Sequence, residues 1–357
     1  MILPRRLRRR VATWVALALL IEGTTMVGTV ALSAQTLTFT RVGVIEGPID
    51  LVRAEGTFAY VARGDTLTVF DIAEPAAPVQ RGSHVFPEKI WGFTVTDSLA
   101  YVAAGHSGLW ILDVSSAESP TLRGSIKTPG QAKNVAVSGT TAVVADHMSG
   151  VDIVDISNVT EPFLVGSFYT DGYARDVAMF GSLVYAVDHP TGFYVLDVSQ
   201  TDPLEPVASL QSASAPRLVE ILDANPNIAV LVGGVPYDPL RALRTESAPV
   251  DRGGALQIYD VSDPASPVHV VTYATPGDAQ RVDVRGALAF VADGPMGLTV
   301  VDLSTPLNPR VVGAFTLGSA ARDVAVTDAA VLVLAGSLRR GSQSQDDGNV
   351  IILRANR

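Results

Sequence analysis

A unit of about 42 residues recurs along this chain, and this period constrains the fold more than any other feature of the sequence. Its clearest marker is an aspartate that ends an apolar run. The marker recurs at Asp71, Asp113, Asp155, Asp197, Asp260 and Asp302, with spacings of 42, 42, 42, 63 and 42 residues. A fixed period of this length is typical of repeat architectures, in which each unit packs mainly on its neighbours.

Each unit carries the signals of four short strands. In the third copy the predicted strands are 134–138, 142–145, 151–156 and 163–168, separated by turn-forming Gly, Asn, Ser and Pro. After residue 34, no stretch keeps an apolar period of 3.6 residues, so the pattern predicts an all-β protein. Four-stranded sheets arranged radially as the blades of a β-propeller protect their edges, and we predict that architecture.

The two ends of the repeat region complement each other. The last copy supplies three strands, at 323–327, 331–335 and 350–353, and lacks an outer one. The strand predicted at Leu37–Val44 resembles an outer strand, because its Arg-Val-Gly matches Leu-Val-Gly at 164–166. We therefore predict a ring of seven blades in which Leu37–Val44 completes the last blade beside 350–353.

The repeated motifs resemble a known family. They are GLWILDVSSAESP at 108–120, GVDIVDISNVTEP at 150–162, ALQIYDVSDPASP at 255–267 and GLTVVDLSTPLNP at 297–309. These segments look like the LVIVD repeat, and the resemblance covers nearly all of the chain after residue 34. Members of that family are mostly exported or surface proteins of bacteria and archaea and generally lack an assigned activity. The resemblance thus implies a location outside the cytoplasm and leaves the function open.

The first 34 residues have the features of an export signal. Five arginines lie between positions 5 and 10, an apolar core follows at 11–21, and small residues occupy 31–34. We predict a signal peptide cleaved before Gln35, with an uncleaved membrane anchor as the alternative. Residues 35–357 then form a single propeller domain that is periplasmic, secreted or on the cell surface. Only an uncleaved leader would contact a membrane.

Charge and composition exclude several classes of function. After residue 34 the chain holds 21 basic and 35 acidic side chains, and this net charge of −14 argues against nucleic-acid binding. The chain has no cysteine, which excludes thiol catalysis, thiolate metal sites and disulfides. The nucleophile elbow, the phosphate-binding loop and the zinc-protease motif are also missing.

The recurrent aspartates have a structural interpretation. An aspartate at the end of a strand accepts hydrogen bonds from the backbone of the turn that it starts. A residue present in nearly every copy serves the repeat itself. We therefore assign a turn role to Asp71, Asp113, Asp155, Asp197, Asp260 and Asp302.

A second recurring position carries cations. It lies at the predicted start of the first strand in five copies and holds Lys133, Arg175, Arg217, Arg281 (after Gln280) and Arg322. The first strand of a propeller blade is innermost, so these side chains should converge at one mouth of the central channel. There they would attract a carboxylate, a phosphate or an acidic sugar. The alternative is that Arg175 and Arg322, each followed by an aspartate, form ion pairs between adjacent blades.

The turns between second and third strands should lie at the same mouth. His147 and His189 follow Asp146 and Asp188 in two of these turns, and imidazole with carboxylate suits a divalent metal or proton transfer. The structural alternative is that Asp, Gly and Pro serve the turns themselves. We predict no cofactor, because a metal would need three or four of these ligands to converge.

Two copies carry insertions in this same turn, at about 233–254 and 336–349. Insertions on repeat scaffolds often lie on the functional face, where Tyr237 would add an aromatic contact. The alternative is that both are tolerated loops, partly disordered.

These features together predict an exported, monomeric, non-catalytic propeller that binds a protein, a glycan or a small anionic ligand. It would use its loop-rich face and the channel mouth. One alternative is a hydrolase or lyase, which requires His147, His189 and Arg175 to converge at one pocket. Another is a module of a larger cell-surface assembly, and the fold alone does not choose among the three.

Overall fold

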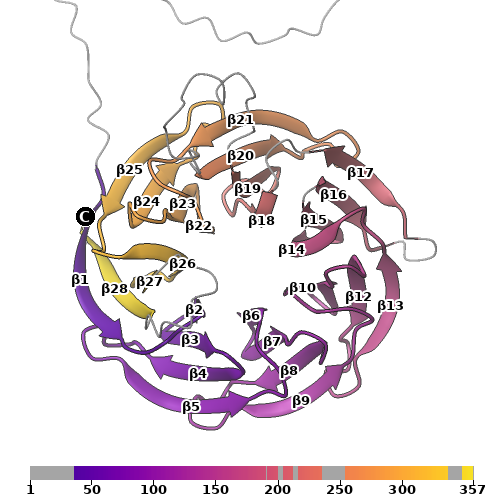
Figure 1. The fold of residues 1–357 in the computed structure, drawn as a ribbon, viewed down its shortest axis with the longest axis horizontal. Coiled ribbons are helices and arrows are strands. Elements are labelled where there is room, and N and C mark those ends of the chain that lie inside the picture. The colour runs from indigo at the N-terminus through magenta and orange to yellow at the C-terminus, as the bar shows by residue number, and fades with distance from the viewer. Residues whose placement is uncertain are drawn as a thin grey trace, which may run out of the picture. The chain divides into compact units, whose positions relative to one another are not determined.

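Seven four-stranded antiparallel sheets stand around a central axis, as Figure 1 shows. The computed structural model describes residues 36–189, 191–199, 204–211, 216–234, 254–336 and 348–356. Residues 35–357 make up one unit by their internal contacts. Among the described residues there is no helix, and accordingly none with the length and apolar character to cross a membrane. The predicted seven-bladed β-propeller is confirmed, whereas the predicted leader at 1–34 lies outside the described residues.

The first three blades run from the innermost to the outermost strand in chain order. Blade 1 consists of β2 (Leu51–Glu55), β3 (Phe58–Arg63), β4 (Thr66–Asp71) and β5 (Val79–Val85). Blade 2 consists of β6 (Gly92–Thr96), β7 (Leu99–Ala103), β8 (Leu109–Asp113) and β9 (Thr121–Ile126). Blade 3 consists of β10 (Asn134–Ser138), β11 (Thr141–Ala145), β12 (Val151–Asp155) and β13 (Phe163–Phe168). The strands predicted for the third copy are confirmed, with ends that differ by at most one residue.

The next three blades repeat this order. Blade 4 consists of β14 (Tyr173–Phe180), β15 (Leu183–His189), β16 (Gly192–Asp197) and β17 (Pro206–Gln211). Blade 5 consists of β18 (Pro216–Ile221), β19 (Ile228–Gly234), β20 (Gly254–Asp260) and β21 (Val268–Ala274). Blade 6 consists of β22 (Arg281–Arg285), β23 (Leu288–Ala292), β24 (Leu298–Asp302) and β25 (Arg310–Phe315).

The seventh blade is assembled from both ends of the described chain. It consists of β26 (Ala320–Val326), β27 (Val331–Gly336), β28 (Asn349–Asn356) and β1 (Thr38–Ile45). β1 is antiparallel to β28, with Thr38 opposite Asn356 and Ile45 opposite Val350; they are the indigo and yellow strands of Figure 1. The predicted closure is confirmed, and the closing strand begins and ends one residue later than predicted.

The core lies between adjacent blades, because each sheet is covered on both faces by its neighbours. Between blades 3 and 4, for example, Val143 and Ile153 pack in one cluster with Val177 and Val184. The neighbour of Val143 along the strand, Val144, is also fully buried. Burial on both faces explains why the second and third strands are continuous apolar runs rather than alternating ones.

The six recurrent aspartates lie where third strands end. Each accepts a hydrogen bond from the backbone N–H two residues ahead, at 2.8–3.0 Å. At Asp155, the hydroxyl and the N–H of Ser157 lower the pKa of the carboxyl. These contacts hold the turn that leads to the outer strand, which is the geometry of an Asx turn.

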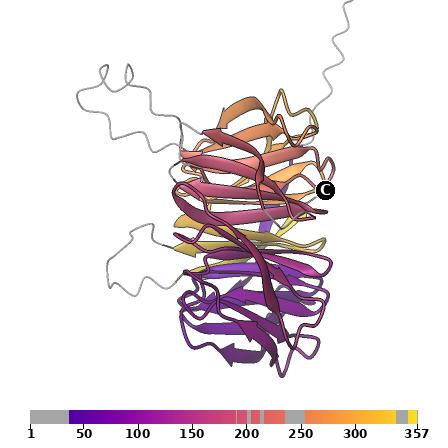
Figure 2. The same cartoon turned by 90° about the vertical axis from the view of Figure 1, so that its right-hand side faces the viewer.

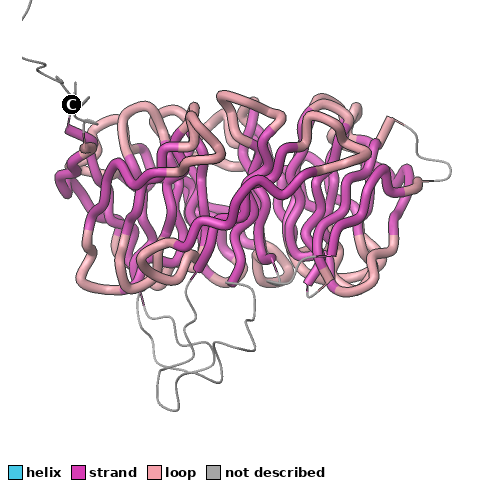
Figure 3. The backbone as a smooth tube through the Cα atoms, turned by 90° about the horizontal axis from the view of Figure 1, so that it is seen from above, coloured by secondary structure: helices cyan, strands magenta, loops and turns pink. Residues whose placement is uncertain are grey.

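Seen from the side, the strands run between the two faces of the ring and the loops lie on both faces (Figure 2, Figure 3). One face carries the loops that lead into each first strand, here called the leading loops, together with the turns between second and third strands. Isolated bridges join the two kinds of segment, since Gly105 pairs with Ala132 and His147 with Ala174. We call this side of the ring the mouth face.

Candidate functional site

Buried aspartates fix the leading loops on the mouth face. Three aspartates lie near or just after the end of a second strand, and their side chains are fully buried: Asp146, Asp188 and Asp293. Asp188 accepts the N–H groups of Gly172 and Tyr173, at 2.9 and 3.0 Å. Asp293 likewise accepts the N–H of Gly277 at 3.0 Å. Each carboxylate thus anchors the loop just ahead of a mouth residue, which explains why these turns carry aspartate.

A pocket of about 650 Å³ opens on the mouth face over the central channel. Six cationic side chains line it: Lys89, Lys133, Arg175, Arg217, Arg281 and Arg322. Each comes from a different blade, from the second to the seventh. Among the described residues that line the pocket, Asp50 of the first blade is the only carboxylate. A strongly positive site therefore lies in a protein whose net charge is negative.

Three of the arginines occupy β-bulges. The pairing between the first and second strands shifts by one residue at Arg175 in β14, at Arg217 in β18 and at Arg322 in β26. A bulged residue leaves the hydrogen-bonded ladder, so its side chain can be directed away from the regular alternation of the strand. The same local device thus brings an arginine into the pocket in blades 4, 5 and 7.

Arg281 lies deeper than the other cations. Its Nε is 2.9 Å from Oδ1 of Asp323, and only 18% of its side chain is exposed. The sequence analysis gave ion pairs between adjacent blades as an alternative role for these cations. Arg281 of blade 6 forms such a pair with Asp323 of blade 7. Among the described residues, no ion pair involves Arg322, one of the two arginines for which the alternative predicted such a pair.

Trp91 and Lys133 form one wall of the pocket. The Nζ of Lys133 lies 3.3 Å from the centroid of the Trp91 indole, and Nζ of Lys89 lies 5.7 Å from it. Burial, and after it the charge of Arg175, lowers the pKa of Lys133 to about 8. The indole face attracts the ammonium form and opposes these two effects.

The two histidines singled out from the sequence differ in their placement. His147 lines the pocket and stacks on Tyr173, with ring centroids 4.8 Å apart. Burial, followed by the charges of Lys133 and Arg175, lowers the pKa of His147. His189 is not among the described residues that line the pocket, although burial and Arg175 lower its pKa as well.

The other features singled out from the sequence are the possible metal ligands and the two insertions. Within the described ranges, no three His, Asp or Glu side chains are grouped so as to hold a metal ion. Tyr237 and most of both predicted insertions lie outside the described residues, at 235–253 and 337–347. Both gaps fall between a second and a third strand, as the sequence predicts.

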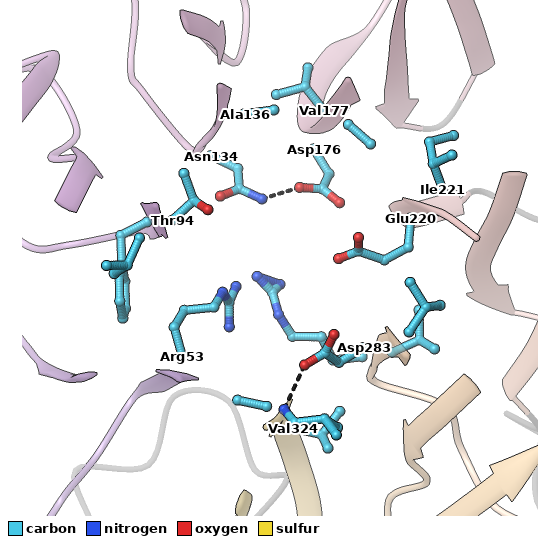
Figure 4. A pocket seen from close by; sticks show the side chains of 18 of the residues that line it. Arg53, Thr94, Asn134, Ala136, Asp176, Val177, Glu220, Ile221, Asp283 and Val324 are labelled. Atoms are coloured by element: carbon cyan, nitrogen blue, oxygen red, sulfur yellow. Dashed lines mark hydrogen bonds between the residues drawn. The ribbon is translucent and has the colours of Figure 1, made fainter. Parts of the chain in front are cut away.

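Below the mouth, the first strands enclose a channel of about 410 Å³ (Figure 4). Apart from Arg281, the sequence analysis assigned no role to its charged residues. The charged residues of its wall are Arg53, Asp176, Glu220, Asp223, Arg281, Asp283 and Arg285. Burial, then repulsion by Asp283 and Asp176, raises the pKa of Glu220 to about 8. Asp176 accepts the N–H of Val219 at 2.9 Å and so joins blades 4 and 5. The sequence signal that could have revealed this channel is a charged residue within an otherwise apolar first strand, such as Glu220 in β18.

Comparison with known proteins agrees with the repeat pattern. The family model of the LVIVD repeat matches residues 47–84, 91–128, 129–170, 171–207, 250–275 and 276–316, which together exceed half of the chain. None of the curated proteins compared with the chain matches it.

Several solved propellers have a similar fold. A chain of the mitotic checkpoint complex is 11% identical, with 96% of this chain and 99% of that one covered and a TM-score of 0.68. The β-propeller domain of Cps50 (Swd1) from Myceliophteria thermophila is 11% identical, with 89% and 100% covered and a TM-score of 0.66. The WD40 domain of Pan2 from Neurospora crassa is 12% identical, with 91% and 97% covered and a TM-score of 0.63. At such identities the likeness shows the fold alone.

Proposed function

Because the chain belongs to the LVIVD repeat family, whose pattern fixes a ring and names no reaction, we propose a function from the pocket itself. The protein is a non-catalytic binding propeller that takes an anionic ligand at its channel mouth. The observation that carries the proposal is the convergence of six cations, one from each of six blades, on a pocket whose described lining includes a single carboxylate, Asp50. Such a site focuses a positive field on a space that an anion can enter.

The size and chemistry of the pocket favour a small ligand or a single acidic group. Ligand pockets for small molecules usually enclose about 300–1,000 Å³, and this one encloses about 650 Å³. Arginine guanidinium groups bind carboxylate and phosphate through paired hydrogen bonds. Arg217 and Arg322 are suited to this role because they come from different blades and approach the pocket from separate directions. A carboxylate, a phosphate or the acidic sugar of a glycan meets these requirements.

The location of the protein is part of the proposal. The arginine cluster, apolar core and small residues of 1–34 support export through a signal peptide. Mass spectrometry of the mature protein from the native cell envelope and culture medium tests this, with cleavage expected before Gln35. Recovery of the full-length chain from the cytoplasm alone would contradict it.

The hydrolase or lyase alternative needs His147, His189 and Arg175 to face one pocket. His147 and Arg175 do so, whereas His189 is not in the described lining. A binding role needs only the cations, and for that reason we propose binding.

A thermal-shift screen of residues 35–357 against phosphate, citrate and glucuronate tests the anion site. A ligand at one hundred times its Kd should stabilise the protein by about 2.7 kcal/mol. We expect the shift to vanish in the double variant Arg217→Ala/Arg322→Ala. The matched control Arg123→Ala/Arg354→Ala removes two exposed arginines from the outer part of the ring and should keep the shift. An equal loss in both double variants would contradict the assigned site.

A further inference from the structure

We propose that Lys133 is a nucleophilic amine that forms an imine with carbonyl compounds that carry an acidic group. The chemical class includes oxo acids and aldehydes that bear a carboxylate or a phosphate. The inference rests on the proposed anion pocket and adds a covalent step that the pocket alone does not imply. It concerns one amine whose surroundings differ from those of the other two lysines in the chain, Lys89 and Lys127.

The backbone fixes the base of Lys133. Its N–H donates to the carbonyl of Ala145 at 2.8 Å, directly before β10 begins. Its side chain is half-buried in the pocket and its Nζ lies 3.3 Å from the centroid of Trp91. In the described part of the chain, no ion pair involves Lys133. The amine therefore faces a fixed aromatic wall and other cations rather than a carboxylate that would hold its proton.

Burial and the neighbouring cations raise the neutral fraction of this amine, although the Trp91 indole acts in the opposite direction. Lysines become nucleophilic when they are desolvated or placed beside another cation, and both conditions apply to Lys133, whose pKa burial and Arg175 lower to about 8. At pH 7, about one-tenth of the amines with that pKa are neutral. For an ordinary lysine the neutral fraction is below about one in a thousand. The pKa of His147, in the same pocket, is lowered as well, by burial and then by the charges of Lys133 and Arg175.

The arginines of the pocket supply the second requirement, a place for the acidic group. Arg217 and Arg322 line the same pocket as Lys133. An acid group held by them brings the attached carbonyl into the space that Nζ faces. The lone pair of Nζ adds to the carbonyl carbon to give a carbinolamine. The carbonyl oxygen then leaves as water with the two hydrogens of the neutral amine and an imine remains, so that no oxidant or reductant is consumed.

Reductive labelling tests the proposal on the whole of residues 35–357. The protein is treated with glyoxylate and cyanoborohydride at pH 7, and the modified peptides are quantified by mass spectrometry. Lys89 shares the pocket but is exposed, and Lys127 is exposed elsewhere on the ring, so both are internal controls. We expect Lys133 to be labelled about tenfold faster than either, because a larger neutral fraction outweighs its weaker basicity. The labelling rate of Lys133 should level off above about pH 8.

Two comparisons separate this inference from the proposed function. With the neutral probe acetaldehyde, the preference for Lys133 should persist but shrink, and Arg217→Ala/Arg322→Ala should remove the extra preference for glyoxylate. Equal labelling of the three lysines would overturn the imine, even if glyoxylate still stabilised the fold and so upheld the anion site. A preference for Lys133 that is the same with both probes would uphold the reactive amine and contradict the anion site. Lys133→Arg, which keeps the charge, should abolish labelling at this position without unfolding the protein.

Discussion

The Nε of Arg281 lies 2.9 Å from Oδ1 of Asp323, and this ion pair crosses the boundary between the sixth and seventh blades. The other oxygen of the same carboxylate accepts the N–H of Val52 at 3.0 Å. It also lies 3.1 Å from Nη1 of Arg53. One buried carboxylate therefore joins three consecutive blades at the place where the ring closes.

We expect Asp323→Ala to lower the free energy of unfolding by about 3–5 kcal/mol, because two partly buried guanidinium groups lose their shared partner. Urea unfolding at pH 7 measures the change. Asp328→Ala, an exposed position two residues after the same strand, should stay within about 0.5 kcal/mol of the parent. A loss at Asp323 as small as that of the control would mean that the three blades do not depend on this carboxylate.

The channel predicts an unusual dependence of stability on pH. The folded protein keeps the proton of Glu220 up to about pH 8, whereas the ordinary pKa is 4.5. In this window the native state binds more protons than the unfolded chain, so the free energy of unfolding falls as pH rises from about 4.5 to 8. We expect Glu220→Gln to flatten this decline between pH 6 and pH 8 in urea unfolding curves.

Asp152 provides the comparison for that experiment. Burial raises the pKa of its carboxyl to about 7, so it contributes a separate decline with the same sign. Asp152→Asn should reduce the slope between about pH 4 and pH 7 and leave the decline between pH 7 and pH 8 unchanged. If Glu220→Gln has the same slope as the parent throughout, the carboxyl is already ionised in the folded protein at neutral pH.

The closing strand should contribute to the core and not only to the sheet. Ile45 is 2% exposed and packs in a cluster with Ile49 and Val52 of the neighbouring blade. Ile45→Ala should therefore lower the free energy of unfolding by about 2–5 kcal/mol in urea. Arg41→Ala, at an exposed position of the same strand, is the control and should change little. Similar small losses for both would contradict the packing of this strand against blade 1.

Anion binding should depend on both the charge and the shape of Arg322. Replacement by Ala should weaken binding of phosphate or citrate by about 1.5–3 kcal/mol, which corresponds to a charge-assisted hydrogen bond. Replacement by Lys keeps the charge without the planar pair of donors and should recover only part of that loss. Isothermal titration at two salt concentrations measures both effects, and the parent should bind more weakly at the higher one. Identical affinities for the Ala and Lys variants would place the anion away from this side chain.

The fold could be predicted from the sequence because its determinants are local and repeated. Asp155 ends the same kind of strand as Asp113 one period earlier, so each copy supports the assignment of the others. The closure followed from simple complementarity, a missing outer strand after residue 353 and a surplus one at Leu37–Val44. For the turn aspartates the physical cause lies within a few residues of the pattern, and for the closure it lies in the strand count of the first and last copies.

The site could be predicted only in part, because its details depend on how strands meet. Arg175 occupies a bulge because β15 offers no residue opposite it. No spacing along β14 reveals this. Arg281 was grouped with the mouth cations and does line that pocket, but the spacing did not reveal its ion pair with Asp323. Glu220 was missed because a charged residue in a short strand normally indicates a solvent-facing position. Only the closed ring turns that position into a channel wall.

The pairing of β1 with β28 joins residues such as Thr40 and Asn356, which are 316 positions apart. During synthesis β1, the first of the described strands, must therefore wait for β28, the last of them, to be made. Until β28 is made, the growing ring is open, and the apolar flanks of its two terminal blades and the free edge of β27 are uncovered. Uncovered flanks and edges are the surfaces through which incomplete chains associate. The interval before β28 becomes available is thus the one in which this protein most needs protection from association with other copies of itself.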